Sequence, residues 1–436
     1  MPLAYPVVLV PGITASSLRD EYGLPPETVW AALTKEYERV ALHPDNLRYE
    51  TIEPARIAPD TVLEIAYKEL IEELRYNLRE QQDQSVPVFP FAYDWRQPLE
   101  ATEAQLAEFV DEVIERTKLL RHYRATGFDA NPRVNLVGHS MGGLVIAGYL
   151  ARIGDKARVS KVATLATPFR GSFEAVIQIT TGTANLGSHA PSSRERETSR
   201  LTPALYHLIP SCTGLTVNPP PLPPKDLFEP TLWQPSIVKT LQEYVRLYAA
   251  DPTGAGQQAA KLFSSLLSDA GKHRARIENF KPADAGLGPN DWLCVAGVNS
   301  KTRVRLNVAP AADGTPEFNL QSADRDDQWN ETDAIKSPLT GDGTVPFPGA
   351  VANFIPIESI VCVTPDDYGS WELQDRLTTK VGGFHGILPN MDMLHRLLVR
   401  FFTGRPDGRK NTWGRSAPGV AKADWKPPLA LDHEPK

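Results

Sequence analysis

The sequence predicts an α/β protein in which a mainly parallel sheet is flanked by helices. Short β-branched runs alternate with longer segments of helical apolar spacing, which is typical of βαβ units. Proline accounts for 39 of 436 residues, and this abundance argues against an all-helical bundle. The expected strands are residues 7–10, 86–91, 134–137, 159–166, 292–298, 304–308 and 357–363. The expected helices are residues 29–40, 62–80, 99–120, 141–153 and 390–402.

The alternation of strands and helices is interrupted once. Residues 172–290 are proline-rich and helical or irregular, with no clear strand. We predict that they form a helical cap or lid inserted into an α/β core, which is built from residues 1–171 and 291–403. Residues 404–436 are rich in Gly, Pro and basic side chains, and are expected to form an extended C-terminal tail.

Composition and the N-terminal residues indicate which binding partners and which cellular compartment to expect. The 46 basic and 53 acidic residues give a net charge of −7, which disfavours nucleic-acid binding. The first residues, MPLAYPVVLV, have no basic segment and only a short apolar run, so no signal peptide or membrane span is expected. Three distant cysteines, Cys212, Cys294 and Cys362, suggest buried thiols and no metal site. We expect a cytoplasmic protein, with peripheral membrane contact left open.

The most specific motif is Gly138-His139-Ser140-Met141-Gly142, which follows an apolar strand and precedes a helix rich in small residues. This G-x-S-x-G context is that of a nucleophile elbow, where a strained turn exposes the serine hydroxyl. Small residues at 138 and 142 let the strand and the helix approach each other. Ser140 is therefore the predicted nucleophile, and the alternative is a chance match in a loop.

A serine nucleophile needs a base and an acid, which follow it in that fold in the order Ser, Asp or Glu, His. His385 stands in a glycine-flanked loop before the last helix and is the predicted base. Asp342, in Gly341-Asp342-Gly343, is the predicted acid, with an ordinary turn as its alternative. Less favoured candidates are His189, His207 and His395 for the base, and Asp313, Asp366 and Asp367 for the acid.

Two backbone N–H groups are candidates for an oxyanion hole. Met141 follows the nucleophile at the start of a helix, where amides carry positive partial charge. Ile13 follows Pro11-Gly12 after the first strand, and this segment either supplies the second donor or is a plain strand-ending turn.

Together these segments resemble the lecithin:cholesterol acyltransferase family of α/β-hydrolases. Besides the elbow, the similar pieces are residues 7–12 (VVLVPG), 93–96 (YDWR), 165–172 (LATPFRGS) and 341–346 (GDGTVP), with His385 at the base position. The resemblance implies an α/β-hydrolase fold, serine chemistry on fatty-acyl esters and a mobile lid. Secreted members carry a signal and disulfides, and neither is seen here. We expect Asp94 and Arg96 to form a salt bridge that fixes their loop.

The sequence thus predicts a serine hydrolase of the phospholipase or lipase type, working through Ser140, His385 and Asp342 and an acyl-enzyme. No metal or organic cofactor is needed for this chemistry. The expected partner is a lipid or another acyl-ester substrate, with a membrane surface and a regulatory protein left open. Two alternatives remain: an acyltransferase that moves a fatty acyl group to an alcohol, and a catalytically silent lipid-binding or interaction module.

Overall fold

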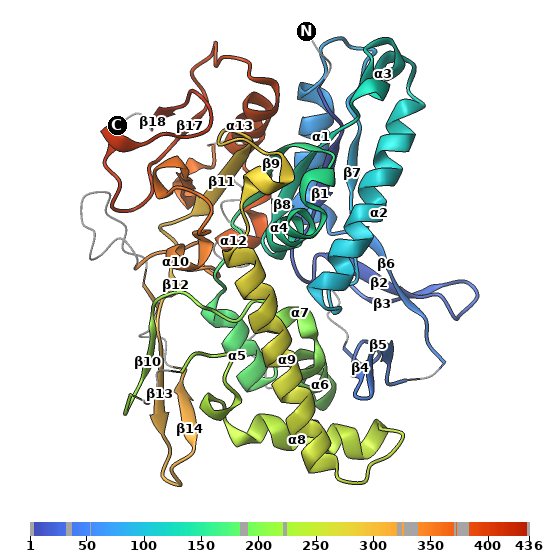
Figure 1. Ribbon diagram of the computed structural model, residues 1–436, viewed down its shortest axis with the longest axis vertical. Coiled ribbons are helices and arrows are strands. Elements are labelled where there is room, and N and C mark those ends of the chain that lie inside the picture. Colours follow the sequence, from blue (N-terminus) through green and yellow to red (C-terminus); the bar gives the residue numbers. More distant parts are fainter. Residues whose placement is uncertain are drawn as a thin grey trace.

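A six-stranded parallel sheet forms the centre of the computed structural model (Figure 1). The structure describes residues 4–31, 37–52, 54–183, 191–220, 225–320, 325–326, 339–369, 372 and 383–433. The strand order is β16-β11-β9-β8-β1-β7, and every neighbouring pair is parallel. The strands are β1 (Val7–Val10), β7 (Val88–Pro90), β8 (Val134–His139), β9 (Val159–Leu165), β11 (Trp292–Gly297) and β16 (Val361–Val363). The predicted mainly parallel sheet is confirmed.

Helices cover both faces of this sheet, which explains why its strands are apolar throughout. In β1, Val8 and Val10 belong to one hydrophobic cluster, whereas Val7 and Leu9 belong to another on the opposite face. The first cluster includes residues of α2 (Leu99–Lys118) and α4 (Met141–Ile153). The second includes residues of α1 (Glu64–Asn77) and α13 (Asp392–Thr403). The alternation along β1 therefore sets the two layers.

Near the N-terminus, a small antiparallel sheet includes some residues that were predicted to be helical. The predicted helix at 29–40 is wrong at its start, because Glu27–Trp30 form strand β3. The predicted helix at 62–80 begins late, since β6 (Ile57–Val62) precedes α1. Short apolar runs fit either period, and here pairing with β2 (Ser16–Asp20) decides for strand. A separate two-stranded pair is formed by β4 (Leu42–His43) and β5 (Asn46–Glu50).

The segment after β9 builds a second lobe below the sheet in the view of Figure 1. Its helices are α5 (Phe173–Thr181), α6 (Ser193–Leu201), α7 (Pro203–Tyr206), α8 (Pro235–Tyr248) and α9 (Ala255–Glu278). It also contains strand β10 (Leu215–Val217) in a region where no clear strand was expected. Strand β10 pairs with the hairpin β13 (Leu306–Pro310) and β14 (Pro316–Asn319), so the predicted strand near 304–308 lies outside the central sheet.

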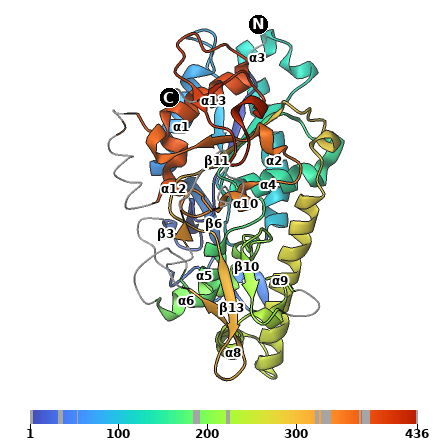
Figure 2. The same cartoon turned by 90° about the vertical axis from the view of Figure 1, so that its left-hand side faces the viewer.

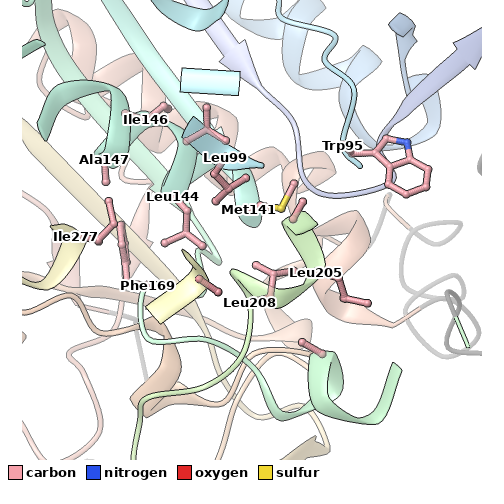
Figure 3. Packing of buried hydrophobic residues seen from close by; sticks show 14 of the residues in the cluster. Trp95, Leu99, Met141, Leu144, Ile146, Ala147, Phe169, Leu205, Leu208 and Ile277 are labelled. Carbon is pink, nitrogen blue, oxygen red and sulfur yellow. The ribbon is translucent and has the colours of Figure 1, made fainter. Parts of the chain in front are cut away.

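Helix α9 runs from this lobe to the core and is anchored there by a buried guanidinium (Figures 1 and 2). Arg274 donates to the carbonyl oxygens of Phe169, His207 and Ile209. Burial lowers the pKa of Arg274 to about 10. Apolar contacts continue the same junction, where Leu205 and Ile277 share a cluster with Met141 and Leu144 (Figure 3).

The C-terminal tail covers the edge of the sheet at β16. Its strands are β17 (Trp413–Gly414) and β18 (Asp432–His433), and Arg415 forms a bridge with Cys362 of β16. Arg415 also forms an ion pair with Asp367, and the indole of Trp425 donates to the carbonyl oxygen of Ile360. These contacts cap an edge strand that would otherwise present unpaired backbone groups.

The remaining short helices and strands are α3 (Arg121–Ala125), α10 (Phe347–Ala350), α12 (Phe384–Ile387), β12 (Thr302–Arg303) and β15 (Arg325–Asp326). The three cysteines are buried and unpaired. Within the described segments, no helix has both the length and the apolar character needed to cross a bilayer.

Candidate active site

Ser140 lies at a sharp turn between the end of β8 and the first residue of α4. Its φ of 52° and ψ of −128° fall in a region that a non-glycine residue rarely occupies. Two contacts hold the turn: the Ser140 N–H donates to Leu165 at 2.9 Å, and Gly143 N–H donates to the Ser140 carbonyl at 3.1 Å. The structure therefore forms the predicted elbow.

Three glycines make this turn sterically possible, because they have no Cβ atom. A Cβ on Gly142 would lie 2.1 Å from the carbonyl oxygen of Val10, and one on Gly138 would lie 2.8 Å from Gly143. Gly143 lies outside the motif, and a Cβ on it would be only 1.9 Å from Thr167 Oγ1. Glycine is required at 138 and 142 because β8, α4 and the end of β1 approach almost to backbone contact, and at 143 because the Thr167 side chain fills the space.

His385 joins Ser140 to Asp342 in a hydrogen-bonded relay. The distance from His385 Nε2 to Ser140 Oγ is 2.8 Å, and that from His385 Nδ1 to Asp342 Oδ2 is 2.7 Å. His385 is in α12, and its side chain is 12% exposed, whereas that of Asp342 is 1% exposed. The structure thus brings together the three side chains that the sequence nominated, although Ser140 lies more than 200 residues before the other two.

The Asp342 carboxylate is fixed by its own loop. Its Oδ1 accepts from the backbone N–H groups of Thr344 and Val345 at 2.9 and 2.7 Å, which leaves Oδ2 for His385. The loop stands at the end of β11, where a Cβ on Gly297 would lie 2.6 Å from that of Asp342. A carboxylate held this way can orient an imidazole and stabilise its charged form.

The less favoured candidates have other contacts. Asp313 accepts from Thr315 in an exposed turn, and Asp367 pairs with Arg415 of the tail. Asp366 is in a short helical turn before it. His395 is buried on α13 and contacts the Pro389 carbonyl, while His189 lies outside the described residues. None of Asp313, Asp366, Asp367 and His395 has a hydrogen bond to Ser140 within the part of the chain that the structure describes.

One predicted oxyanion donor, Met141, is adjacent to Ser140 in the chain, and the other, Ile13, follows a glycine that lies beside Ser140 in space. Met141 is the first residue of α4, where backbone N–H groups have no intrahelical acceptor. Ile13 follows Gly12, and a Cβ on Gly12 would lie 3.0 Å from that of Ser140. The Gly12 N–H itself donates to the Tyr67 hydroxyl at 3.0 Å. It is therefore engaged, and Ile13 offers the next amide.

The residues 93–96 (YDWR) hold the loop that carries Ile13. The Tyr93 hydroxyl donates to the Pro11 carbonyl at 2.8 Å, and the Trp95 indole donates to the Ser16 carbonyl at 3.1 Å. Arg96 and Asp94 form the predicted salt bridge at 2.7 Å. This motif therefore clamps both ends of residues 11–16, a role that its sequence alone did not indicate.

Arg96 is completely buried between two carboxylates. Besides Asp94 it contacts Glu50 at 3.0 Å and the Val40 carbonyl at 3.0 Å. Burial raises the pKa of Asp94, but Arg96 more than offsets this, so the pKa lies below its ordinary value. For Glu50 burial dominates, and the pKa is raised. Removing Arg96 would leave two buried charges uncompensated, so its role is structural.

His139 and Tyr67 belong to the site but were not predicted. The Tyr67 hydroxyl lies 2.7 Å from His139 Nδ1, and His139 Nε2 lies 2.9 Å from the His385 carbonyl oxygen. Burial, with a smaller contribution from His385, lowers the pKa of His139 to about 3, so its ring is neutral. The only sequence signal was the histidine within the elbow motif itself, because Tyr67 lies far away on α1.

A small cavity of about 50 Å³ lies between the Ile13 loop and the second lobe. Ile13, Thr14 and Trp95 form one side of it. The other side comes from α5, α6 and the start of α7, and is mostly polar, with Gln178, Thr198, Ser199, Thr202 and Leu205. Residues from the predicted cap thus approach the loop next to Ser140.

One set of described side chains has ligand atoms close enough for a metal ion: Glu100, His207 and His273, within 4.8 Å of one another. These groups are already part of an ion network. His273 Nε2 contacts Glu103 at 2.8 Å, and Glu103 pairs with Arg276 at 2.6 Å. Burial lowers the pKa of both histidines, and Arg274 and Arg276 lower it further. The nearby guanidinium groups disfavour binding of another cation. We therefore interpret these side chains as a polar contact that joins α9 to α2.

The sequence model of the lecithin:cholesterol acyltransferase family matches residues 52–350. The chain belongs to this family. Membership makes it a serine esterase or lipase, or an O-acyltransferase, and its substrates are of the lipid-ester type. No curated protein matches this family member in sequence.

One solved structure supports the fold of this lecithin:cholesterol acyltransferase family member, and two others match it more weakly. The structure described as the Tle4-Tli4 complex has a TM-score of 0.58 at 14% identity, covering 92% of this chain and 98% of that one. This similarity confirms the α/β-hydrolase class. Phospholipase PlaB from Legionella pneumophila matches with a TM-score of 0.26 and 13% identity, over 58% of this chain and 37% of that one. The lin2722 gene product from Listeria innocua has a TM-score of 0.30 and 12% identity, over 93% and 96%.

Proposed function

We propose that the protein hydrolyses fatty-acyl esters of lipids, with Ser140 as nucleophile, His385 as general base and Asp342 as the orienting acid. The supporting observation is the relay, with 2.8 Å from Ser140 Oγ to His385 Nε2 and 2.7 Å from His385 Nδ1 to Asp342 Oδ2. An unassisted serine hydroxyl is a weak nucleophile, and such a relay is what activates it.

The reaction proceeds in two steps through an acyl-enzyme. Ser140 attacks the ester carbonyl while His385 takes its proton, and the N–H groups of Met141 and Ile13 stabilise the oxyanion. His385 then gives the proton to the leaving alcohol. Water, activated by the same imidazole, releases the fatty acid and restores Ser140.

The lobe of residues 172–290 is the proposed cap, between core parts 1–171 and 291–403, with 404–436 as the tail. Ser172 Oγ donates to the Thr344 carbonyl at 2.5 Å, which links the start of this lobe to the acid loop. Because α6 and α7 line the cavity beside Ile13, movement of these helices would change the space available to a long acyl chain.

Acyl transfer is the second candidate, because the family model that matches is that of an acyltransferase. The acyl-enzyme is common to both reactions, and an alcohol that reaches it before water would receive the acyl group. The two outcomes differ only in the acceptor.

The decisive experiment compares wild type with Ser140→Ala and His385→Ala on two substrates. A p-nitrophenyl ester series measures hydrolysis and chain length, and phosphatidylcholine mixed micelles test a lipid. We expect both variants to lose at least about 10⁴-fold in kcat and Ser140→Ala to lose fluorophosphonate labelling. Retained hydrolysis in Ser140→Ala would refute the triad, and no turnover by wild type on any ester would favour a silent module. Adding a long-chain alcohol and measuring new ester against free fatty acid separates transfer from hydrolysis.

A further inference from the structure

The helix that carries His385 is too short to be stable alone. Helix α12 has only four residues, Phe384–Ile387, and a single turn fixes several backbone dihedrals for few internal hydrogen bonds. Besides the two bonds of the His385 side chain, three tertiary hydrogen bonds hold its backbone in the described structure. The His385 N–H donates to the Asp342 carbonyl at 3.0 Å, and the Tyr368 hydroxyl donates to the Ile387 carbonyl at 2.7 Å. The third is the contact of 2.9 Å between His139 Nε2 and the His385 carbonyl.

The partners of His139 determine which nitrogen carries its proton. A carbonyl oxygen can only accept, so Nε2 must donate to the His385 carbonyl. Nδ1 of the neutral ring is then an acceptor, and the Tyr67 hydroxyl, 2.7 Å away, donates to it. The ring is 3% exposed and packs edge-on against Tyr67 with centroids 5.6 Å apart. No water is needed to satisfy it.

The same hydroxyl reaches the other side of the site. Tyr67 uses its only hydrogen toward His139, and its oxygen accepts the Gly12 N–H at 3.0 Å. Gly12 precedes Ile13 in the loop beside Ser140. A continuous chain of bonds thus runs from the Gly12 amide through Tyr67 and His139 to the backbone of His385. It joins four segments that meet only in the folded chain.

We propose that Tyr67 and His139 are positioning residues that hold the general base and the Ile13 loop in one fixed relation to Ser140. The proposal rests on the function proposed above. Displacing a reacting group by about 1 Å costs on the order of 10²-fold in rate, so a chain that fixes both partners of the nucleophile acts on kcat. Neither side chain exchanges a proton with substrate.

The test separates the two bonds of His139. In His139→Gln the amide nitrogen falls near the Nε2 position and keeps a donor for the His385 carbonyl. In His139→Asn the amide oxygen falls near Nδ1 and keeps only the bond to Tyr67. Tyr67→Phe removes the hydroxyl from both Gly12 and His139.

We expect His139→Asn to lose about 10- to 100-fold in kcat and Tyr67→Phe about 10-fold, with KM on a short p-nitrophenyl ester changed less than about threefold. His139→Gln is expected to recover most of the loss of His139→Asn. Fluorophosphonate should still label Ser140 completely in each folded variant, but with a lower rate constant.

Tyr123→Phe is the matched control. Tyr123 is equally buried, at 1% exposure, and its hydroxyl donates to the Ala4 carbonyl at 2.8 Å, in a part of the fold that carries no site residue. It should lower the thermal midpoint about as much as Tyr67→Phe and leave kcat unchanged. A positioning role predicts this divergence, whereas a purely structural role predicts equal behaviour.

The proposal is overturned if Tyr67→Phe and His139→Asn keep kcat within about twofold of Tyr123→Phe. A second measurement does not depend on activity or on the stability of variants at 139: ¹⁵N NMR of the imidazoles in Ser140→Ala. A protonated Nε2 and an unprotonated Nδ1 at His139 support the chain, and the reverse tautomer refutes it. If Ser140→Ala retains turnover, the proposed function fails instead.

Discussion

The nucleophile and the base of this site are held in different ways. Ser140 lies between a six-residue strand in the middle of the sheet and a 13-residue helix, and close packing at Gly138, Gly142 and Gly143 enforces its turn. His385 lies in a four-residue helix that has little structure of its own. It is positioned by hydrogen bonds with Asp342, Tyr368 and His139, of which Asp342 accepts from the His385 N–H and the other two donate to carbonyl oxygens of the helix.

This difference shows that local packing positions the nucleophile, whereas non-local packing positions the base. The elbow is specified within about ten residues, since a strand, a tight turn and a small-residue helix follow one another directly. The base depends on segments that meet only after the sheet has formed. Substitutions should therefore damage the elbow through steric overlap and the base through lost hydrogen bonds.

The largest expected effect concerns the acid, which serves the base and not the elbow. Asp342→Asn should lower kcat by about 10³- to 10⁴-fold, because the amide cannot hold His385 in the tautomer that accepts the Ser140 proton. Steady-state kinetics on a p-nitrophenyl ester measures it. Asp313→Asn, in an exposed turn with Thr315, is the control and should change kcat less than twofold. Equal losses in both variants would mean that Asp342 is not the orienting acid.

The second prediction compares glycines in the two regions. Gly142→Ala would place a Cβ 2.1 Å from a backbone oxygen and should lower the free energy of unfolding by roughly 3 kcal/mol or more. Gly386→Ala, in the helix of the base, meets nothing within 4 Å. It should leave stability unchanged or raise it by about 0.5 kcal/mol. Urea unfolding of both variants gives the values, and a tolerated alanine at 142 would contradict the steric account of the elbow.

The smallest expected effect is on the pH dependence of stability and concerns His395, which lies outside the catalytic relay. Burial lowers the pKa of His395, partly offset by its bond to the Pro389 carbonyl. Below about pH 6.5, the ordinary pKa of histidine, His395 binds a proton in the unfolded chain but not in the folded chain. The free energy of unfolding therefore decreases as the pH is lowered. His395→Gln should reduce that slope by up to about 1.4 kcal/mol per pH unit between pH 6.5 and 5.5.

Urea unfolding at pH 7.5, 6.5 and 5.5 measures this slope. The glutamine amide can keep a donor for the Pro389 carbonyl, so stability at pH 7.5 should change little. If the slopes of wild type and His395→Gln coincide, His395 titrates normally in the folded protein and is not the buried neutral ring described here.

Much of the site was readable from the sequence because its chemistry is carried by local motifs. Ser140, Asp342 and His385 each stand in a short glycine-containing segment at the end of a strand or before a helix. The less favoured Asp313 looked similar in sequence, but it is exposed and bonds Thr315, whereas Asp342 is buried and bonds His385. Tyr67 had no signal, since a tyrosine on the apolar face of α1 reads as ordinary core.

The errors in the fold have a physical cause as well. Residues 29–30 and residue 62 were assigned to helical patterns, but they belong to strands that pair with β2. The strand predicted near 304–308 pairs with β10 of the second lobe, a partner that the sequence did not indicate. A short apolar run carries too little periodicity to specify its partner, so pairing is decided by what lies beside it.

The sequence by itself determined the α/β class, the elbow around Ser140 and the order of nucleophile, acid and base. Each follows from residues within one strand, one turn or one loop, where sterics and hydrogen bonding act over a few neighbours. Only the tertiary structure decided that the YDWR side chains clamp the loop of Ile13, and that Tyr67 and His139 tie this loop to His385. Those relations join segments that are far apart in the chain, and no local pattern records them.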